Sequence, residues 1–187
     1  MRAGIAVLFL VLICVMAVTY ALADQNTSKQ DDLVARGEYL VRIGGCDDCH
    51  TPKIVGPNGI MPDMDRRLSG QPASEQIKPV SPGVLQPDGW MVMTNKHLAA
   101  WAGPWGVSFA INLTPDKTGL AEWTEGAFIR AMRTGKHRGF GRPILPPMPW
   151  QGIGAMTDDD LKAVFAFLQS IKPIANAVPE PIPPSGQ

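Results

Sequence analysis

Five consecutive residues, Cys46-Asp47-Asp48-Cys49-His50, combine residue types and a spacing that suit one kind of chemistry. Two thiols three positions apart lie on the same side of one helical turn, and a histidine follows the second thiol directly. In such a C-x-x-C-H pattern each thiol can add to one vinyl group of a haem, and the histidine is carried beneath the iron. The motif therefore predicts a covalent c-type haem at Cys46 and Cys49, with His50 as its proximal ligand.

Two other interpretations of the cysteine pair are weaker. A thioredoxin-type dithiol also has the C-x-x-C spacing, but it lies in a β-α-β setting that this sequence does not show. A structural zinc site needs a fourth ligand, and only His97 and His137 could supply a good one.

The sixth position on the iron decides whether such a protein carries electrons or catalyses a reaction. The chain has nine methionines, seven of them beyond residue 23: Met61, Met64, Met91, Met93, Met132, Met148 and Met156. Met148 differs from the others because prolines flank it in Pro146-Pro147-Met148-Pro149. Proline fixes φ and keeps the preceding residue extended, so such a segment can hold a weak thioether–iron bond. We expect Met148 as distal ligand, with Met156 and then His97 as alternatives and a surface turn as the simpler interpretation.

The ring of a proximal histidine normally donates its second N–H to a carbonyl, which fixes the tautomer and the ring plane. We expect a backbone acceptor shortly after the motif. Pro57, in a turn of glycine and proline, is the candidate, and an ordinary turn proline is the equal alternative.

Residues 1–23 have the pattern of a targeting segment. Arg2 is followed by an apolar run from Ile5 to Val18, and Ala21-Leu22-Ala23 resembles a signal-peptidase site. A retained membrane anchor is the alternative, because the run approaches the roughly 20 residues that a spanning helix needs. Either interpretation places residues 24–172 as one domain outside the inner membrane, in the periplasm. The 17 basic and 17 acidic residues balance, which argues against a nucleic-acid partner.

Helical signals stand at both ends of this domain. After a polar lead, residues 24–30, a first helix is expected from about Ser28 to Gly44. Further helices should begin at Thr124, with Met132 on its inner face, and at Thr157. Residues 51–111 are rich in glycine and proline, with a short helix expected at 94–101 and a strand at 107–112. Pro173 should end the last helix, and residues 173–187 should form a disordered proline-rich tail.

Three segments together resemble a known family: Cys46-Asp47-Asp48-Cys49-His50-Thr51-Pro52, Asn112-Leu113-Thr114-Pro115-Asp116 with Trp123, and Pro146-Pro147-Met148-Pro149. The chain is similar to class I monohaem cytochromes c, and more narrowly to cytochrome subunits of bacterial periplasmic dehydrogenases. The resemblance implies an all-α fold with crossed first and last helices around one covalent haem, and Gly37 opposite Phe165 or Leu168. It also implies thioether links at Cys46 and Cys49 and iron ligation by His50 and Met148. The long 51–105 insertion departs from compact members.

These patterns predict a protein that transfers single electrons and is not itself an enzyme. Its partners would be a donor dehydrogenase and an acceptor cytochrome or oxidase. Six basic side chains either steer an acidic partner and pair with haem propionates or form an ordinary solvated surface: Arg130, Arg133, Lys136, His137, Arg138 and Arg142. The alternatives are a peroxidase-like haem enzyme using His97 or His137, and a cytochrome subunit fixed in a membrane-associated dehydrogenase complex.

Overall fold

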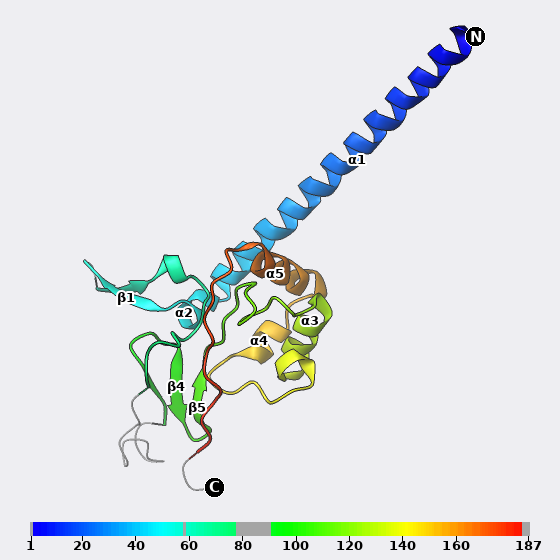
Figure 1. The fold of residues 1–187 in the computed structure, drawn as a ribbon. Helices are drawn as coiled ribbons and strands as arrows, with labels where there is room; N and C mark the ends of the chain where they lie inside the picture. The colour runs from blue at the N-terminus through cyan, green and yellow to red at the C-terminus, as the bar shows by residue number, and fades with distance from the viewer. Residues whose placement is uncertain (1, 58, 78–90, 185–187) are drawn as a thin grey trace.

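The computed structural model describes residues 2–57, 59–77 and 91–184, and it shows a helical body that carries two small antiparallel sheets (Figure 1). The elements follow in the order α1 (Arg2–Ile43), α2 (Cys46–His50), β1 (Lys53–Gly56), β2 (Gly59–Pro62), η1 (Met64–Arg66), β3 (Met93–Thr94), β4 (Ala100–Gly103), β5 (Gly106–Phe109), α3 (Glu125–Thr134), η2 (His137–Gly139), α4 (Trp150–Gly154) and α5 (Asp158–Ser170). Helix makes up 40% and strand 14%. The expected all-α class I cytochrome c fold is therefore wrong, and the chain mixes helix and sheet.

The strands form inside the segment expected to be mostly loop. β1 pairs with β2, and β3, β4 and β5 form a second sheet. The short helix expected at residues 94–101 is absent, because that stretch holds the end of β3, a connecting turn at residues 95–99 and the start of β4. Gly103 and Gly106 pair across a two-residue loop, and Gly106 has a φ of 93° that favours glycine. This turn, and the burial of alternate residues along β4, select a hairpin over a helix.

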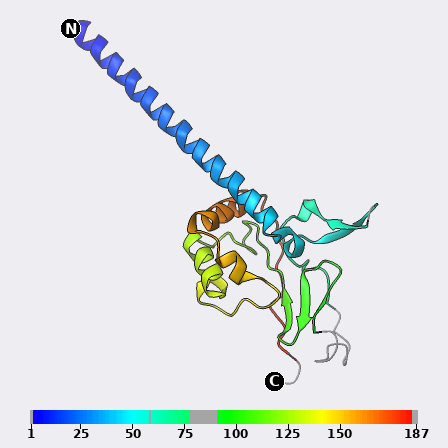
Figure 2. The ribbon, with the colours of Figure 1, turned by 180° about the vertical axis from the view of Figure 1, so that it is seen from behind.

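The first helix is longer than expected. α1 runs without a break from Arg2 to Ile43 and points away from the body (Figures 1 and 2). No helix start appears at Ser28, and residues 24–30 are helical instead of forming a flexible lead. These residues include neither glycine nor proline, so nothing in them interrupts the backbone hydrogen bonds. Among the described residues, no helix combines the length and the apolar character needed to cross a membrane.

The core lies where the last part of α1 packs on α5, with α3 and α4 beside them (Figure 1). At Gly37 the helices approach so closely that an added Cβ would overlap the carbonyl oxygen of Ala163 and the Cβ of Phe167. The facing residues are thus Ala163 and Phe167 instead of Phe165 or Leu168. The core is built mainly from Leu40, Val41, Leu120, Phe128, Ala131, Met132, Leu161, Val164, Phe165 and Leu168.

Both later helices begin where the sequence predicts. The Thr124 side chain accepts a hydrogen bond from the Ala127 N–H, and Gly135 ends α3 with a φ of 65°. The Thr157 side chain caps α5 in the same way through the Asp160 N–H. Met132 is buried, as expected for the inner face of α3.

The chain beyond α5 lies along the body over residues 173–184 instead of forming a disordered tail. Ile182 pairs with Val107 of β5, with N–O distances of 2.7 and 2.9 Å. The Asn176 side chain donates to the carbonyls of Ser69 and Gln71. Proline removes donors from this segment, but its carbonyls and its few N–H groups still find partners on the body.

Candidate functional site

The short helix α2 carries the C-x-x-C-H motif and follows α1 after a sharp turn. Gly45 is its N-cap and has a φ of 67°, a conformation that glycine adopts without strain. The Gly44 N–H still bonds to the Leu40 carbonyl of α1, at 2.8 Å. The first helix therefore delivers the motif to the edge of the core.

The two thiols of the motif are free and half-buried. Burial raises the pKa of the Cys46 thiol to about 11 and also raises that of Cys49. Both sulfurs therefore remain protonated at neutral pH, and neither is used in a disulfide. Cys46 packs against the hydrophobic core, as do Met148 and Ile153.

The imidazole of His50 is buried and is held through one of its two nitrogens. Nδ1 lies 2.8 Å from the carbonyl oxygen of Ile111 and donates its proton there. The predicted acceptor, Pro57, is wrong, because the β1–β2 hairpin carries that proline to an exposed turn. Nε2 has no hydrogen-bond partner in the described part of the chain. Every fully buried side-chain nitrogen or oxygen there does have a partner, so Nε2 is not fully buried and borders accessible space. Burial also lowers the pKa of His50, which favours the neutral ring that ligates metals.

The carbonyl of Ile111 is positioned by the next residue, Asn112. This buried amide donates to the Ile174 carbonyl at 2.7 Å and to Thr118 Oγ1 at 3.0 Å. Its oxygen accepts from the N–H and the hydroxyl of Thr114. The motif beginning at Asn112 thus fixes the loop that orients His50, and sequence reasoning, which chose Pro57, missed this acceptor.

Asp47, on α2, forms an ion pair with Arg67. The Asp47 carboxylate receives three hydrogen bonds from Arg67, at 3.1, 3.3 and 2.9 Å, and one from the Thr51 hydroxyl at 2.7 Å. Arg67 also reaches Glu38 of α1 and lies over the ring of Phe167 of α5. Although burial raises the pKa of Asp47, the hydrogen bonds from Arg67 and Thr51 lower it overall. Sequence reasoning missed Arg67, which ties three helices together.

Met148 is half-buried and packs against the hydrophobic core. The buried hydroxyl of Ser108, on β5, donates to the Pro146 carbonyl at 2.5 Å. On its other side the Trp150 N–H bonds to the Met148 carbonyl, and the Trp150 ring covers Gly135 at the end of α3. Met148 is thus anchored in the same cluster as Cys46. The alternative Met156 also contacts this cluster, whereas Met61, Met64, Met91 and Met93 are exposed.

His97, the third candidate ligand, has no free nitrogen. Its Nδ1 accepts the backbone N–H of Lys53 at 3.0 Å, so Nε2 carries the proton and donates to Glu75 at 2.9 Å. The ring therefore joins β1 to the segment before β3. Within the described ranges, no cluster of three or more His, Cys, Asp or Glu side chains is arranged to hold a metal ion.

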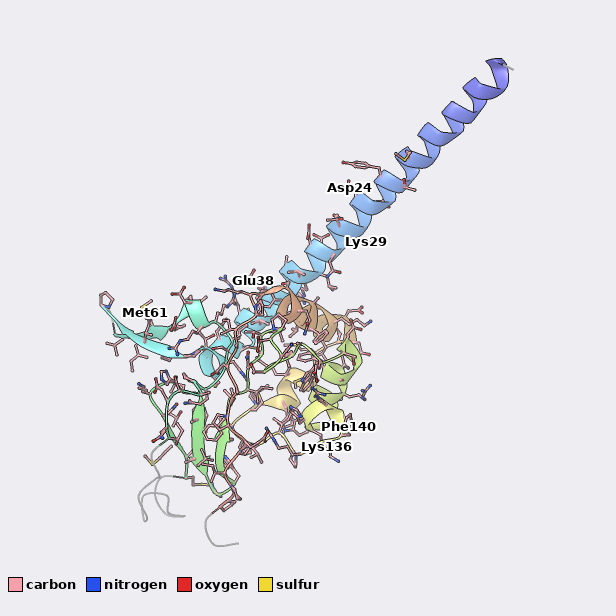
Figure 3. All side chains as sticks on the ribbon, in the orientation of Figure 1. Asp24, Lys29, Glu38, Met61, Lys136 and Phe140 are labelled. Carbon is pink, nitrogen blue, oxygen red and sulfur yellow. The ribbon has the colours of Figure 1, made fainter. Side chains whose placement is uncertain are left out.

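The basic segment, residues 130–142, lies on the far side of the body from the β1–β2 hairpin (Figure 3). The labels of Lys136 and Phe140 mark the basic segment, and the label of Met61 marks the hairpin. Three of its arginines form ion pairs, in the order Arg133–Asp158, Arg138–Glu122 and Arg142–Glu180. The His137 ring meets the Trp123 ring edge-on, with centroids 5.0 Å apart. Much of this charge is thus neutralised within the chain.

Comparison with known proteins identifies relatives, although no protein-family model matches the chain. It is 31% identical to the gluconate 2-dehydrogenase cytochrome c subunit of Pantoea cypripedii, over 84% of this chain and 27% of that protein. It is 27% identical to the cytochrome c subunit of the quinone alcohol dehydrogenase of Gluconobacter oxydans, over 86% of this chain and 26% of that protein. The chain spans about a quarter of the length of these relatives. Its homologues are cytochrome c subunits of bacterial dehydrogenases.

Proposed function

We propose that this chain is a periplasmic electron-transfer protein with one haem c, attached through Cys46 and Cys49 and ligated by His50 and Met148. The observation that carries the proposal is the fixed ring of His50, whose Nδ1 is bound by Ile111 while Nε2 borders accessible space, on the same short helix as two free thiols. These residues fit a haem, because thioether attachment needs thiols and ligation needs a neutral, oriented imidazole.

When bound, the haem iron would cycle between its ferric and ferrous states, which is the redox chemistry that the protein itself lacks. The chain's own residues orient the ligand and bury it. Ile111 sets the plane of the His50 ring, and Ser108 holds the segment that presents Met148. A histidine–methionine pair favours the reduced form and raises the potential.

The partner would be the catalytic subunit of a dehydrogenase, since the named relatives are subunits of such enzymes. Export to the periplasm would follow from the targeting pattern of residues 1–23. A peroxidase-like enzyme receives no support from His97, because both of its ring nitrogens are engaged. Co-purification would tell a fixed subunit from a free carrier, and N-terminal sequencing would tell a cleaved signal from an anchor.

The proposal is tested on the purified protein by haem staining after denaturing electrophoresis and by oxidised and reduced spectra with and without carbon monoxide. Covalent haem and no rapid carbon monoxide binding are expected. Met148→Ala should lose the far-red sulfur-to-iron band and bind carbon monoxide, whereas the exposed Met64→Ala should not. An unchanged Met148→Ala spectrum refutes that ligand, and absence of covalent haem refutes the function.

A further inference from the structure

Lys53, three residues beyond His50, turns its side chain back onto the helix that carries the motif. The residue is 9% exposed, although lysine is rarely buried. Its Nζ donates to the carbonyl oxygens of Asp47, Asp48 and Thr51, at 3.0, 2.8 and 2.5 Å. The ammonium group thus binds the C-terminal carbonyls of α2.

This arrangement uses every donor of the lysine and leaves its charge without a direct ion pair. An ammonium group has three N–H bonds, and three carbonyls receive them. No carboxylate in the described ranges forms an ion pair with Nζ. The carboxylate of Asp47, on the same helix as two of the carbonyls, pairs with Arg67 instead. Burial lowers the pKa of Lys53, so the folded chain holds this charge at a cost.

The backbone of Lys53 is held as firmly as its side chain. Its N–H donates to His97 Nδ1 at 3.0 Å, and Glu75 accepts from the opposite nitrogen of that ring at 2.9 Å. His97 is 2% exposed. The lysine is therefore fixed between α2 and the segment that precedes β3, and its ammonium group has little freedom to leave.

We propose that Lys53 is a positioning residue for the haem ligand His50 and that its fixed positive charge raises the reduction potential of the iron. The inference rests on the proposed function. Cations at the C-terminal end of a helix stabilise its unpaired carbonyls, so the lysine keeps the last turn of α2 in shape. A nearby positive charge in a poorly solvated site also favours the redox state that holds one more electron.

The test compares the reduction potentials of the haem-loaded native chain and of Lys53→Met and Lys53→Gln, which remove the charge and shorten the unbranched reach of the side chain by only one atom. Lys172→Met, at an exposed position, is the matched control. Both Lys53 variants should lower the equilibrium constant for reduction about tenfold, which is about 59 mV for a one-electron couple. The control should leave it unchanged.

A native potential in either neutral variant overturns the proposal. If neither neutral variant takes up haem, Lys53→Arg decides: loading with a native potential supports the need for the charge, and failure to load or a lowered potential overturns it. A native chain without covalent haem would instead refute the proposed function, so the two failures are distinguishable.

Discussion

The Nδ1 atom of His50 and the carbonyl oxygen of Ile111 are 61 residues apart in the sequence and 2.8 Å apart in the structure. Asn112 ties the loop that carries this carbonyl to Ile174, beyond the last helix. Three distant parts of the chain thus fix the orientation of one imidazole. The orientation of the ring therefore depends on tertiary contacts between segments far apart in the sequence.

Gly70 lies between His50 and Ile111 and should not tolerate a side chain. Its N–H donates to the His50 carbonyl at 2.7 Å, and an added Cβ would lie 2.5 Å from the Ala110 carbonyl oxygen and 2.6 Å from the Ile111 carbonyl carbon. Gly70→Ala should lower the free energy of unfolding in urea by about 2–4 kcal/mol, from strain and overpacking.

Gly59→Ala is the matched control for that experiment. Gly70 has a φ of 81° and Gly59 has a φ of 107°, but nothing in the described part of the chain lies within 4 Å of a Cβ added at Gly59. It should therefore show only the backbone penalty of about 1–2 kcal/mol. Equal losses for the two variants would contradict the close packing at Ile111.

Gly37→Ala tests the contact between α1 and α5. Alanine stabilises an open helical position by about 1 kcal/mol relative to glycine, but here its Cβ would overlap Ala163 and Phe167. We expect a net loss of about 1–3 kcal/mol in urea unfolding. Gly152→Ala, in α4, should be neutral or stabilising, because no atom of the described residues outside the helix lies within 4 Å of its added Cβ. A stabilised Gly37→Ala chain would show that the helices do not meet there.

Ser108→Ala should loosen the segment that presents Met148. It removes the bond to the Pro146 carbonyl, at a cost of about 1 kcal/mol. In the haem-loaded protein we expect faster binding of carbon monoxide or imidazole than in the native chain. The control is Ser170→Ala, whose hydroxyl is exposed and bonds only to its own helix. Identical binding rates in both variants would leave the Ser108 anchor without a role in ligation.

Asp47→Asn should change how the stability of the chain depends on pH. Although burial raises the pKa of Asp47, its bonds to Arg67 and Thr51 bring it below the ordinary value. The charged form therefore adds stability that is complete above the unfolded pKa of about 3.9 and is lost as the pH falls through the lower folded value. The variant should lose about 1–2 kcal/mol at neutral pH, and the gap should close below about pH 4. Asp48→Asn, at the exposed neighbour, is the matched control and should cost less stability at neutral pH. A constant gap for Asp47→Asn would contradict the Arg67 pair.

The part of the fold that was predicted correctly rests on local interactions. The caps of α3 and α5 at Thr124 and Thr157 join residues three positions apart, and the end of α3 depends on the conformational freedom of Gly135. The strand expected at residues 107–112 overlaps β5, but the other strands were missed because they are only two to four residues long and show little periodicity. Whether these short strands form depends on their pairing with one another, which the sequence pattern does not show.

The sequence by itself determined the C-x-x-C-H motif, the choice of Met148 as candidate ligand and the starts of the two later helices. Each depends on residues within a few positions of one another. Only the tertiary structure decided that Ile111 orients His50, that Ser108 anchors the Met148 segment and that Lys53 turns back onto the motif. Hydrogen bonds to backbone carbonyls leave no mark on the residue types that accept them, because every residue offers the same carbonyl.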